Sequence, residues 1–164
     1  MRQQRPQTRA RAFTLVELTI VVLMISILAA LVVPKISAGS DESRAAATAT
    51  TVNAVQTKVF EYNAINGSFP ATIDKNWFAD KSLPSNPWDL GYSGTSVQYD
   101  TAASASDTHP AFKFFRNNGV FWYNPKNGRF RALVPAQTTL EETLVIYNKS
   151  NGVTLGDINA TTGG

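Results

Sequence analysis

The chain has 164 residues, of which 43% are hydrophobic and 16% are charged, whereas a globular protein usually has a charged share of about 25%. This composition excludes a disordered acidic or basic protein, and the length fits one folded domain with room for one appended segment. Because the chain has no cysteine, disulfide scaffolds, zinc fingers, iron–sulfur sites and cysteine nucleophiles are also excluded.

The net charge of +3 comes from the first twelve residues. They hold four of the 15 basic residues, Arg2, Arg5, Arg9 and Arg11, and none of the 12 acidic ones. The rest of the chain therefore has 11 basic and 12 acidic residues and offers no positive surface for phosphate. We expect no nucleic-acid contact by the body of the protein.

A long apolar run follows this basic segment. Residues 13–33 read FTLVELTIVVLMISILAALVV, and only Thr14, Glu17, Thr19 and Ser26 among them are polar. As an α-helix this run would be about 31 Å long, which matches a hydrocarbon core of about 30 Å. It is apolar around its whole circumference, so it predicts a membrane-inserting helix rather than a surface helix.

The flanking charges predict the orientation of this helix. Four arginines precede it, whereas the basic residues Lys35 and Arg44 that follow are offset by Asp41 and Glu42. Positive charge is retained on the cytoplasmic side of a membrane. The N-terminus is therefore expected in the cytoplasm and the remainder of the chain outside.

A secretory signal peptide is an alternative interpretation of the same segment, with a cleavage site at the small residues 37–40. However, the run is longer than the usual apolar region of about 7–15 residues. It also contains Glu17, which opposes insertion unless its carboxylate reaches the lipid headgroups or meets a cationic partner.

The sequence around Glu17 resembles the signal of type IV prepilins and type II secretion pseudopilins. Residues 11–18 read RAFTLVEL, which matches a basic leader, a small residue, an aromatic first residue and a glutamate fifth in the mature chain. The resemblance implies that a prepilin peptidase removes residues 1–12 by cutting between Ala12 and Phe13 and methylates the new amino group of Phe13. Ala12 departs from the family, which usually has glycine there, so we expect slower cleavage.

The resemblance also implies a role for Glu17 in assembly. In the family, the glutamate at this place neutralises the N-terminal amine of a neighbouring subunit as that subunit leaves the bilayer for the fibre. Opposite charges that are each costly in a medium of low dielectric attract strongly there. Residues 62–70 (YNAINGSFP) and 83–89 (LPSNPWD) are similar to segments of the type II secretion major pseudopilins and favour that branch.

The protein implied by this resemblance is a non-enzymatic subunit of a pseudopilus, a helical homopolymer of a type II secretion apparatus. Its implied partners are further copies, the prepilin peptidase, the lipid bilayer, a membrane platform and an assembly ATPase. It would first cross the inner membrane once and later form a periplasmic or extracellular filament. A type IV pilus subunit for adhesion, motility or DNA uptake, and a membrane-anchored or secreted ligand-binding domain, remain alternatives.

The exported part, residues 35–164, is expected to begin with a second helical stretch. Pro34 lacks an amide donor and predicts a kink that closes the membrane segment, residues 13–34. A new helix start is predicted at Ser40–Glu42 and an end at Asn66-Gly67. Between this start and this end, mostly apolar residues recur at spacings of three and four, which predicts one buried stripe along the helix. Its members are Ala45, Thr48, Val52, Val55, Val59 and Tyr62.

The rest of the chain predicts loops followed by an antiparallel β-meander. Residues 67–110 contain several prolines and predict loops. Alternating apolar residues and Asn-Gly turns then predict strands. These are 112–116, 120–123 and 129–134, with a second hairpin from 143–147 and 153–155. The expected inward set is Phe112, Phe114, Phe121, Tyr123, Phe130 and Leu133. The predicted fold class is α+β, with the long helix packed on the meander as in type IV pilin-like proteins.

No motif in the sequence indicates catalysis. There is no P-loop, dinucleotide fingerprint or HExxH motif, and His109, the single histidine, lies in a polar loop without evident partners. The major pseudopilins often bind calcium near the C-terminal end, so calcium is an open possibility here. Oxygen ligands could come from Asp89, Asp100, Asp107 and Asp157. They lack EF-hand spacing, and no site can be mapped onto them.

Overall fold

A computed structural model describes residues 13–89, 91, 96–116 and 119–164, with side chains for all of these except residues 30–39. The elements in chain order are α1 (Leu15–Asn66), the 3-10 helix η1 (Lys75–Trp77), β1 (Val97–Tyr99), β2 (Phe121–Asn124), β3 (Arg129–Ala132) and α2 (Leu140–Asn151). The chain divides into two compact units, Met1–Ser40 and Asp41–Gly164. The predicted α+β class is confirmed. The predicted leader, residues 1–12, lies outside the described residues, and the predicted boundary at residues 34 and 35 stays a prediction.

Helix α1 runs for 52 residues without interruption. The separate helix start expected at Ser40–Glu42 is therefore wrong. The side chain of Pro34 lies outside the described part, and the kink expected there stays a prediction. The predicted C-terminal end is confirmed, because Gly67 follows Asn66 with a φ of 70° and donates its amide to the carbonyl of Asn63 at 2.8 Å. This left-handed backbone conformation favours glycine and ends the helix.

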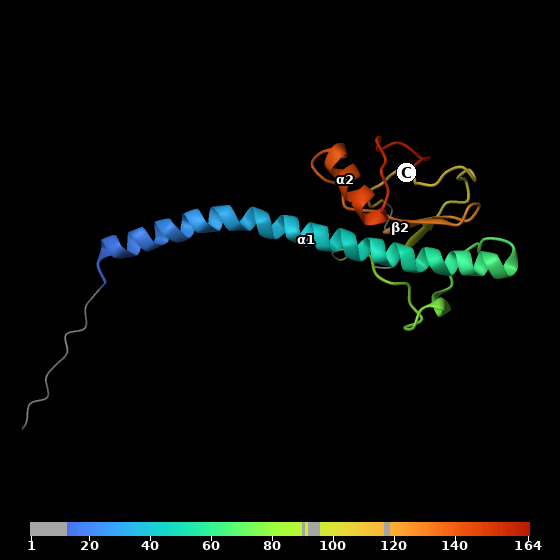
Figure 1. Cartoon of the computed structure of the whole chain (residues 1–164), viewed down its shortest axis with the longest axis horizontal. Coiled ribbons are helices and arrows are strands. Elements are labelled where there is room, and N and C mark those ends of the chain that lie inside the picture. The colour runs from blue at the N-terminus through green and yellow to red at the C-terminus, as the bar shows by residue number, and fades with distance from the viewer. Residues whose placement is uncertain (1–12, 90, 92–95, 117–118) are drawn as a thin grey trace, which may run out of the picture. The chain divides into compact units, whose positions relative to one another are not determined.

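The predicted stripe of α1 forms the core of the second unit. All of its members are buried except Tyr62, which is half-buried. Val52, Val55 and Val59 belong to one apolar cluster with residues of β2 and β3 and of the loop after α1. These partners include Phe121, Tyr123, Phe130, Ile73 and Leu83. Figure 1 shows the sheet and α2 on one side of the C-terminal half of α1.

The sheet has the order β1-β2-β3. β2 and β3 are antiparallel, with Phe121 opposite Ala132, and residues 125–128 join them, which confirms the hairpin predicted at this turn. β1 instead pairs in parallel with β2, with Val97 opposite Phe121. The predicted wholly antiparallel meander is therefore wrong, because β1 comes from a stretch that was expected to be loop. A parallel neighbour requires a long connection, and the chain between β1 and β2 provides it.

Residues 112–116 do not form the predicted strand. They contribute only isolated bridges, such as the one between Phe114 and Val134. Phe112 is 49% exposed, and its ring centroid lies 4.2 Å from the guanidinium carbon of Arg116, so a cation–π contact holds it outside the core. Phe114 is half-buried. The other four residues of the expected inward set are buried as predicted.

Helix α2 stands where a second hairpin was expected. The hydroxyl of Thr139 accepts the amide of Glu142, and the Glu142 carboxylate accepts the amide of Thr139, which is a complete capping box. Gly152, with a φ of 62°, ends the helix. The β-branched residues Val145 and Ile146 suggested a strand, but these two end signals favour a helix. α2 buries Thr143, Tyr147, Ser150 and Asn151.

Candidate functional site

The first turns of α1 form an exposed apolar stem. Its side chains point outward on all sides of the helix, beginning with Phe13, which is 80% exposed. The large apolar members of this stem are Phe13, Leu15, Val16, Leu18, Ile20, Val21, Val22, Leu23, Met24, Ile25, Ile27 and Leu28. A continuous apolar surface of this kind marks an interaction with lipid or with other protein chains. None of the helical segments with described side chains combines the length and apolar content that a membrane crossing needs.

Glu17 lies near the start of the stem, where it forms a capping box with Thr14. Its Oε2 atom accepts the amide of Thr14 at 3.0 Å and the Thr14 hydroxyl at 2.9 Å, and its own amide donates to the Thr14 hydroxyl at 3.2 Å. Its Oε1 atom accepts no hydrogen bond from the described residues. Sequence reasoning missed Thr14, although the Thr-x-x-Glu spacing at the start of an apolar run is a signal of helix capping.

Only some of the predicted site residues belong to the part of the chain that the structure describes. Ala12 lies outside the described residues, and so does the side chain of Pro34. Phe13 directly precedes the capping residue Thr14, so Phe13 and Glu17 are both at the first turn of α1. Processing between Ala12 and Phe13, and pairing of Glu17 with an amine, stay predictions.

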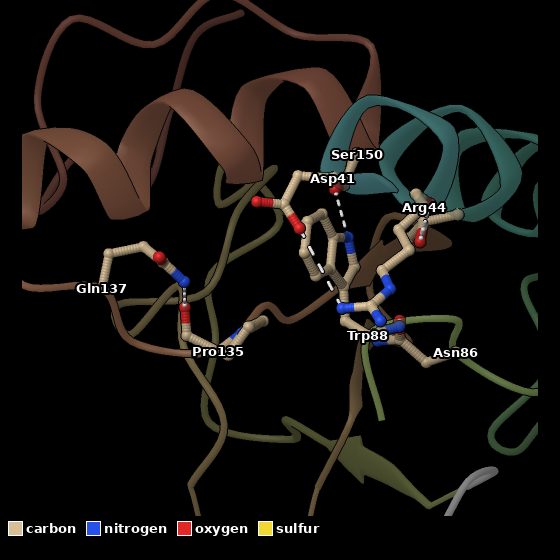
Figure 2. Close-up of polar contacts among 8 residues, drawn as sticks. Asp41, Arg44, Asn86, Trp88, Pro135, Gln137 and Ser150 are labelled. Carbon is tan, nitrogen blue, oxygen red and sulfur yellow. Dashed lines mark hydrogen bonds and ion pairs between the residues drawn. The ribbon is translucent and has the colours of Figure 1, made fainter. Parts of the chain in front are cut away.

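A second candidate surface is a pocket in the domain, which we name the charged pocket. Asp41 and Arg44 form an ion pair with a distance of 4.0 Å between Oδ1 and Nη1, and their side chains are 52% and 37% exposed. They stand at a cavity of about 430 Å³. Its lining consists of Asp41, Arg44, Trp88, Phe115, Pro135, Ala136 and Gln137. Figure 2 shows the ion pair beside the indole of Trp88.

The floor of the charged pocket is held by hydrogen bonds. The indole nitrogen of Trp88 donates to the hydroxyl of Ser150 on α2 at 2.8 Å, and its amide donates to Asn86 Oδ1 at 3.0 Å. The Arg44 guanidinium carbon lies 6.0 Å from the centroid of the indole. Trp88 itself is buried and packs in the same apolar cluster as Ala45 and Tyr147. Sequence reasoning considered Asp41 and Arg44 as flanking charges, and Asp41 also as part of a helix start, and it missed the pocket.

His109 lies in an irregular segment, as expected, but it is fully buried and surrounded by hydrogen-bond partners. Its Nδ1 atom lies 3.0 Å from the Tyr147 hydroxyl and accepts the Nε–H of Arg131 at 3.3 Å, so its Nε2–H donates to the carbonyl of Gly163 at 2.8 Å. Burial, together with the positive charge of Arg131, lowers the pKa of His109 to about 4. The neutral ring thereby links residue 109 to the C-terminal segment through Gly163.

Lys113 holds the same segment. Its buried ammonium donates to the carbonyls of Pro110 and Ala160. Burial lowers the pKa of Lys113 to about 8, and the charge of Asp157 opposes this effect. Together with His109, this lysine fixes the chain after α2 against the sheet side of the domain.

The four aspartates considered for calcium act as acceptors in separate turns. Asp100 accepts the amide of Ala103 and the indole N–H of Trp122, and Asp157 accepts the amide of Asn159. Asp89 and Asp107 accept backbone amides in the same way. Within the described part of the chain, no three histidine, cysteine, aspartate or glutamate side chains gather into a possible metal site.

These features define a class of protein: a small α+β domain carried on a long helix whose first turns form an exposed apolar stem. The chain is 29% identical over 127 residues to the type II secretion system core protein G of Pseudomonas aeruginosa. The match covers 64% of this chain and 87% of the relative. The resemblance to the type II secretion pseudopilins is thereby confirmed. No protein-family model matches the chain, and no solved structure matches it.

Proposed function

We propose that this chain is a structural subunit of a pseudopilus, the filament of a type II protein secretion apparatus. The observation that carries this proposal is the exposed apolar stem, which requires a covering of lipid or of other chains. The similarity to a type II secretion system core protein supports the secretion branch over a type IV pilus. In this role the protein catalyses no reaction.

Before assembly, the stem is inserted in the inner membrane. The apolar run continues in the sequence from Phe13 through Val33, and the arginines before it hold the N-terminus in the cytoplasm. Residues 13–34 then form a single membrane pass, and residues 35–164 form the exported domain. A prepilin peptidase removes residues 1–12, cutting between Ala12 and Phe13, and methylates Phe13.

During assembly, stems of many copies pack together and replace the lipid. The platform and the ATPase of the secretion apparatus drive this step. Glu17 of one copy pairs with the ammonium of Phe13 on a neighbour. The geometry supports this pairing, because both donors of Thr14 bind Oε2 and leave Oε1 available. Cleavage before Phe13 leaves the capping box intact, since the box uses the amide of Thr14.

Two substitutions at Glu17 test the proposal. Glutamine at this position completes a capping box as glutamate does, whereas alanine does not, so Glu17→Gln removes the charge and Glu17→Ala removes charge and cap together. We expect both variants to be inserted and cleaved, as shown by N-terminal mass, but to yield no sheared filaments on immunoblots.

Two results would contradict this account. If Glu17→Gln gives filaments at the wild-type yield, the carboxylate serves only as a helix cap and the charge pairing is wrong. If the wild-type chain, produced with its complete secretion apparatus, builds no filament, the proposed function itself is wrong.

A further inference from the structure

Two ion pairs on residues 41–66 of α1 have their acidic and basic members in opposite order along the chain. Asp41 precedes Arg44, whereas Lys58 precedes Glu61, and Lys58 Nζ lies 2.8 Å from Glu61 Oε2. Both pairs have an i, i+3 spacing, and the residues between Arg44 and Lys58 include no charged side chain. The pairs are therefore two separate charged bands, about 26 Å apart along the helix.

The second band belongs to a larger surface near the end of α1. Lys58, Glu61 and Ile65 are spaced i, i+3 and i+7, so they share one side of the helix. Ile65 is 83% exposed, although isoleucine is among the residues most often buried. We name these three residues the distal face. They border a hollow of about 210 Å³ beside Tyr62 and Trp77.

The charged pocket is complementary to the distal face. When two copies of α1 lie parallel, Asp41 of one copy can meet Lys58 of the other, and Arg44 can meet Glu61. The exposed Ile65 then falls one turn beyond Arg44, at the level of Thr48. Glu42, the neighbouring acid, already pairs with Lys149 at 3.4 Å, so the order of charges presented by the pocket is set by Asp41 and Arg44.

We propose that the charged pocket of one copy binds the distal face of a second copy. This inference rests on the proposed filament function, because stems that enter the membrane in the same direction place all copies of α1 parallel. The two surfaces lie about 100° apart around the helix axis, so one copy uses both at once. A contact between two different surfaces is heterologous, and such contacts repeat into an open helical filament instead of a closed dimer.

Charge swaps test this contact in the full-length chain. The double substitution Lys58→Glu/Glu61→Lys reverses the second band but keeps its net charge and its i, i+3 pairing, and Asp41→Arg/Arg44→Asp does the same for the first band. We expect each swap alone to lower filament yield by about 10-fold or more, because like charges then meet across the contact. The combined swap restores the opposite-charge order, and we expect yield within about two-fold of wild type.

Cross-linking provides a second, independent measurement. The chain has no cysteine of its own, so Ala136→Cys in the charged pocket and Ile65→Cys on the distal face introduce the only thiols. Because the contact is heterologous, we expect a short bis-maleimide to produce a ladder of multimers from filaments of the double variant. As a matched control, Ile65→Cys with Thr154→Cys, an exposed residue outside the pocket, should give no ladder.

The outcomes separate this inference from the proposed function. Suppose that the wild-type chain forms filaments. If both single swaps then assemble normally, or if the pocket variant gives no ladder, the contact is overturned and the filament role stays intact. Swapped variants that fail to rescue each other, although circular dichroism shows them folded and N-terminal mass shows them cleaved, would also overturn it. Absence of filaments from the wild-type chain would instead remove the proposed function.

Discussion

The protonation state of His109 depends on whether the domain is folded. In the folded chain its neutral ring accepts from Arg131 and donates to Gly163, and its pKa falls from 6.5 to about 4. Between these two values the unfolded chain binds a proton that the folded chain does not. The free energy of unfolding must therefore decrease as the pH falls through this interval.

This linkage gives a prediction for stability against acid. We expect the domain to lose up to ~3 kcal/mol of unfolding free energy through His109 between neutral pH and about pH 4. His109→Gln, whose amide can still donate to Gly163 and accept from Arg131, should flatten this part of the pH dependence. Urea unfolding followed by the fluorescence of the tryptophans, all of which lie in the domain, measures both. An unchanged pH dependence in the variant would contradict the role of His109.

At the scale of elements, α1 and α2 both supply hydrogen-bond partners to the outer edge of β3. Gln56 of α1 accepts the amide of Phe130 at 2.9 Å and donates to the carbonyl of Gly128 at 2.6 Å. Asn151 of α2 accepts the amide of Ala132 at 2.8 Å and donates to its carbonyl at 3.0 Å. These side-chain amides take the place of a further strand and close an edge that could otherwise pair with another chain.

Removing one of these amides should destabilise the domain. Gln56→Leu leaves the amide of Phe130 and the carbonyl of Gly128 buried without partners, which we expect to cost ~2–4 kcal/mol of unfolding free energy. Asn53→Leu, an exposed position one turn earlier on α1, is the matched control and should change the stability by less than about 0.5 kcal/mol. Equal urea midpoints for Gln56→Leu and the control would show that the edge of β3 does not depend on Gln56.

The elements that could be predicted from sequence are those whose signals are local. The stripe of α1 from Ala45 to Val59 and the turn between β2 and β3 each depend on residues close together in the chain, and both are confirmed. β1 was not predicted, because its pairing depends on β2, more than twenty residues later, and because the strand is only three residues long. For α2 a local signal existed, the Thr139–Glu142 capping box, but the β-branched residues inside the helix outweighed it.

The same distinction applies to the candidate site. The apolar stem is continuous in sequence, so hydropathy alone predicts it. The charged pocket is not, since Arg44, Trp88 and Gln137 come together only when α1 and the segment before α2 pack on the same domain. Glu17 was predicted in part, because its acidic charge was evident in the sequence but its capping partner Thr14 was overlooked.

At the scale of the whole molecule, the apolar stem and the charged pocket would contribute differently to binding between copies. Burial of the stem contributes roughly 25 cal/mol for each Å² of apolar area removed from water, but it has little preference for one register over another. Exposed ion pairs contribute little to affinity, yet a mismatch between them penalises wrong arrangements. In the proposed filament, the stem would therefore supply cohesion, and the charged pocket and the distal face would set the axial position of each copy.

Retention of the leader should separate membrane insertion from assembly. In an uncleaved chain the nitrogen of Phe13 is a neutral amide, so Glu17 of a neighbour has no ammonium to pair with, and four arginines precede the stem. Moving those charges into an apolar filament core would be costly. We expect Ala12→Glu to block cleavage, to leave the chain in the membrane with its leader, and to abolish filaments, whereas Ala12→Gly should be cleaved at least as fast as the wild type and assemble normally. Membrane fractionation, N-terminal mass and the yield of sheared filaments measure these three properties. Filaments built from chains that still carry residues 1–12 would show that a free amine at Phe13 is not needed for assembly.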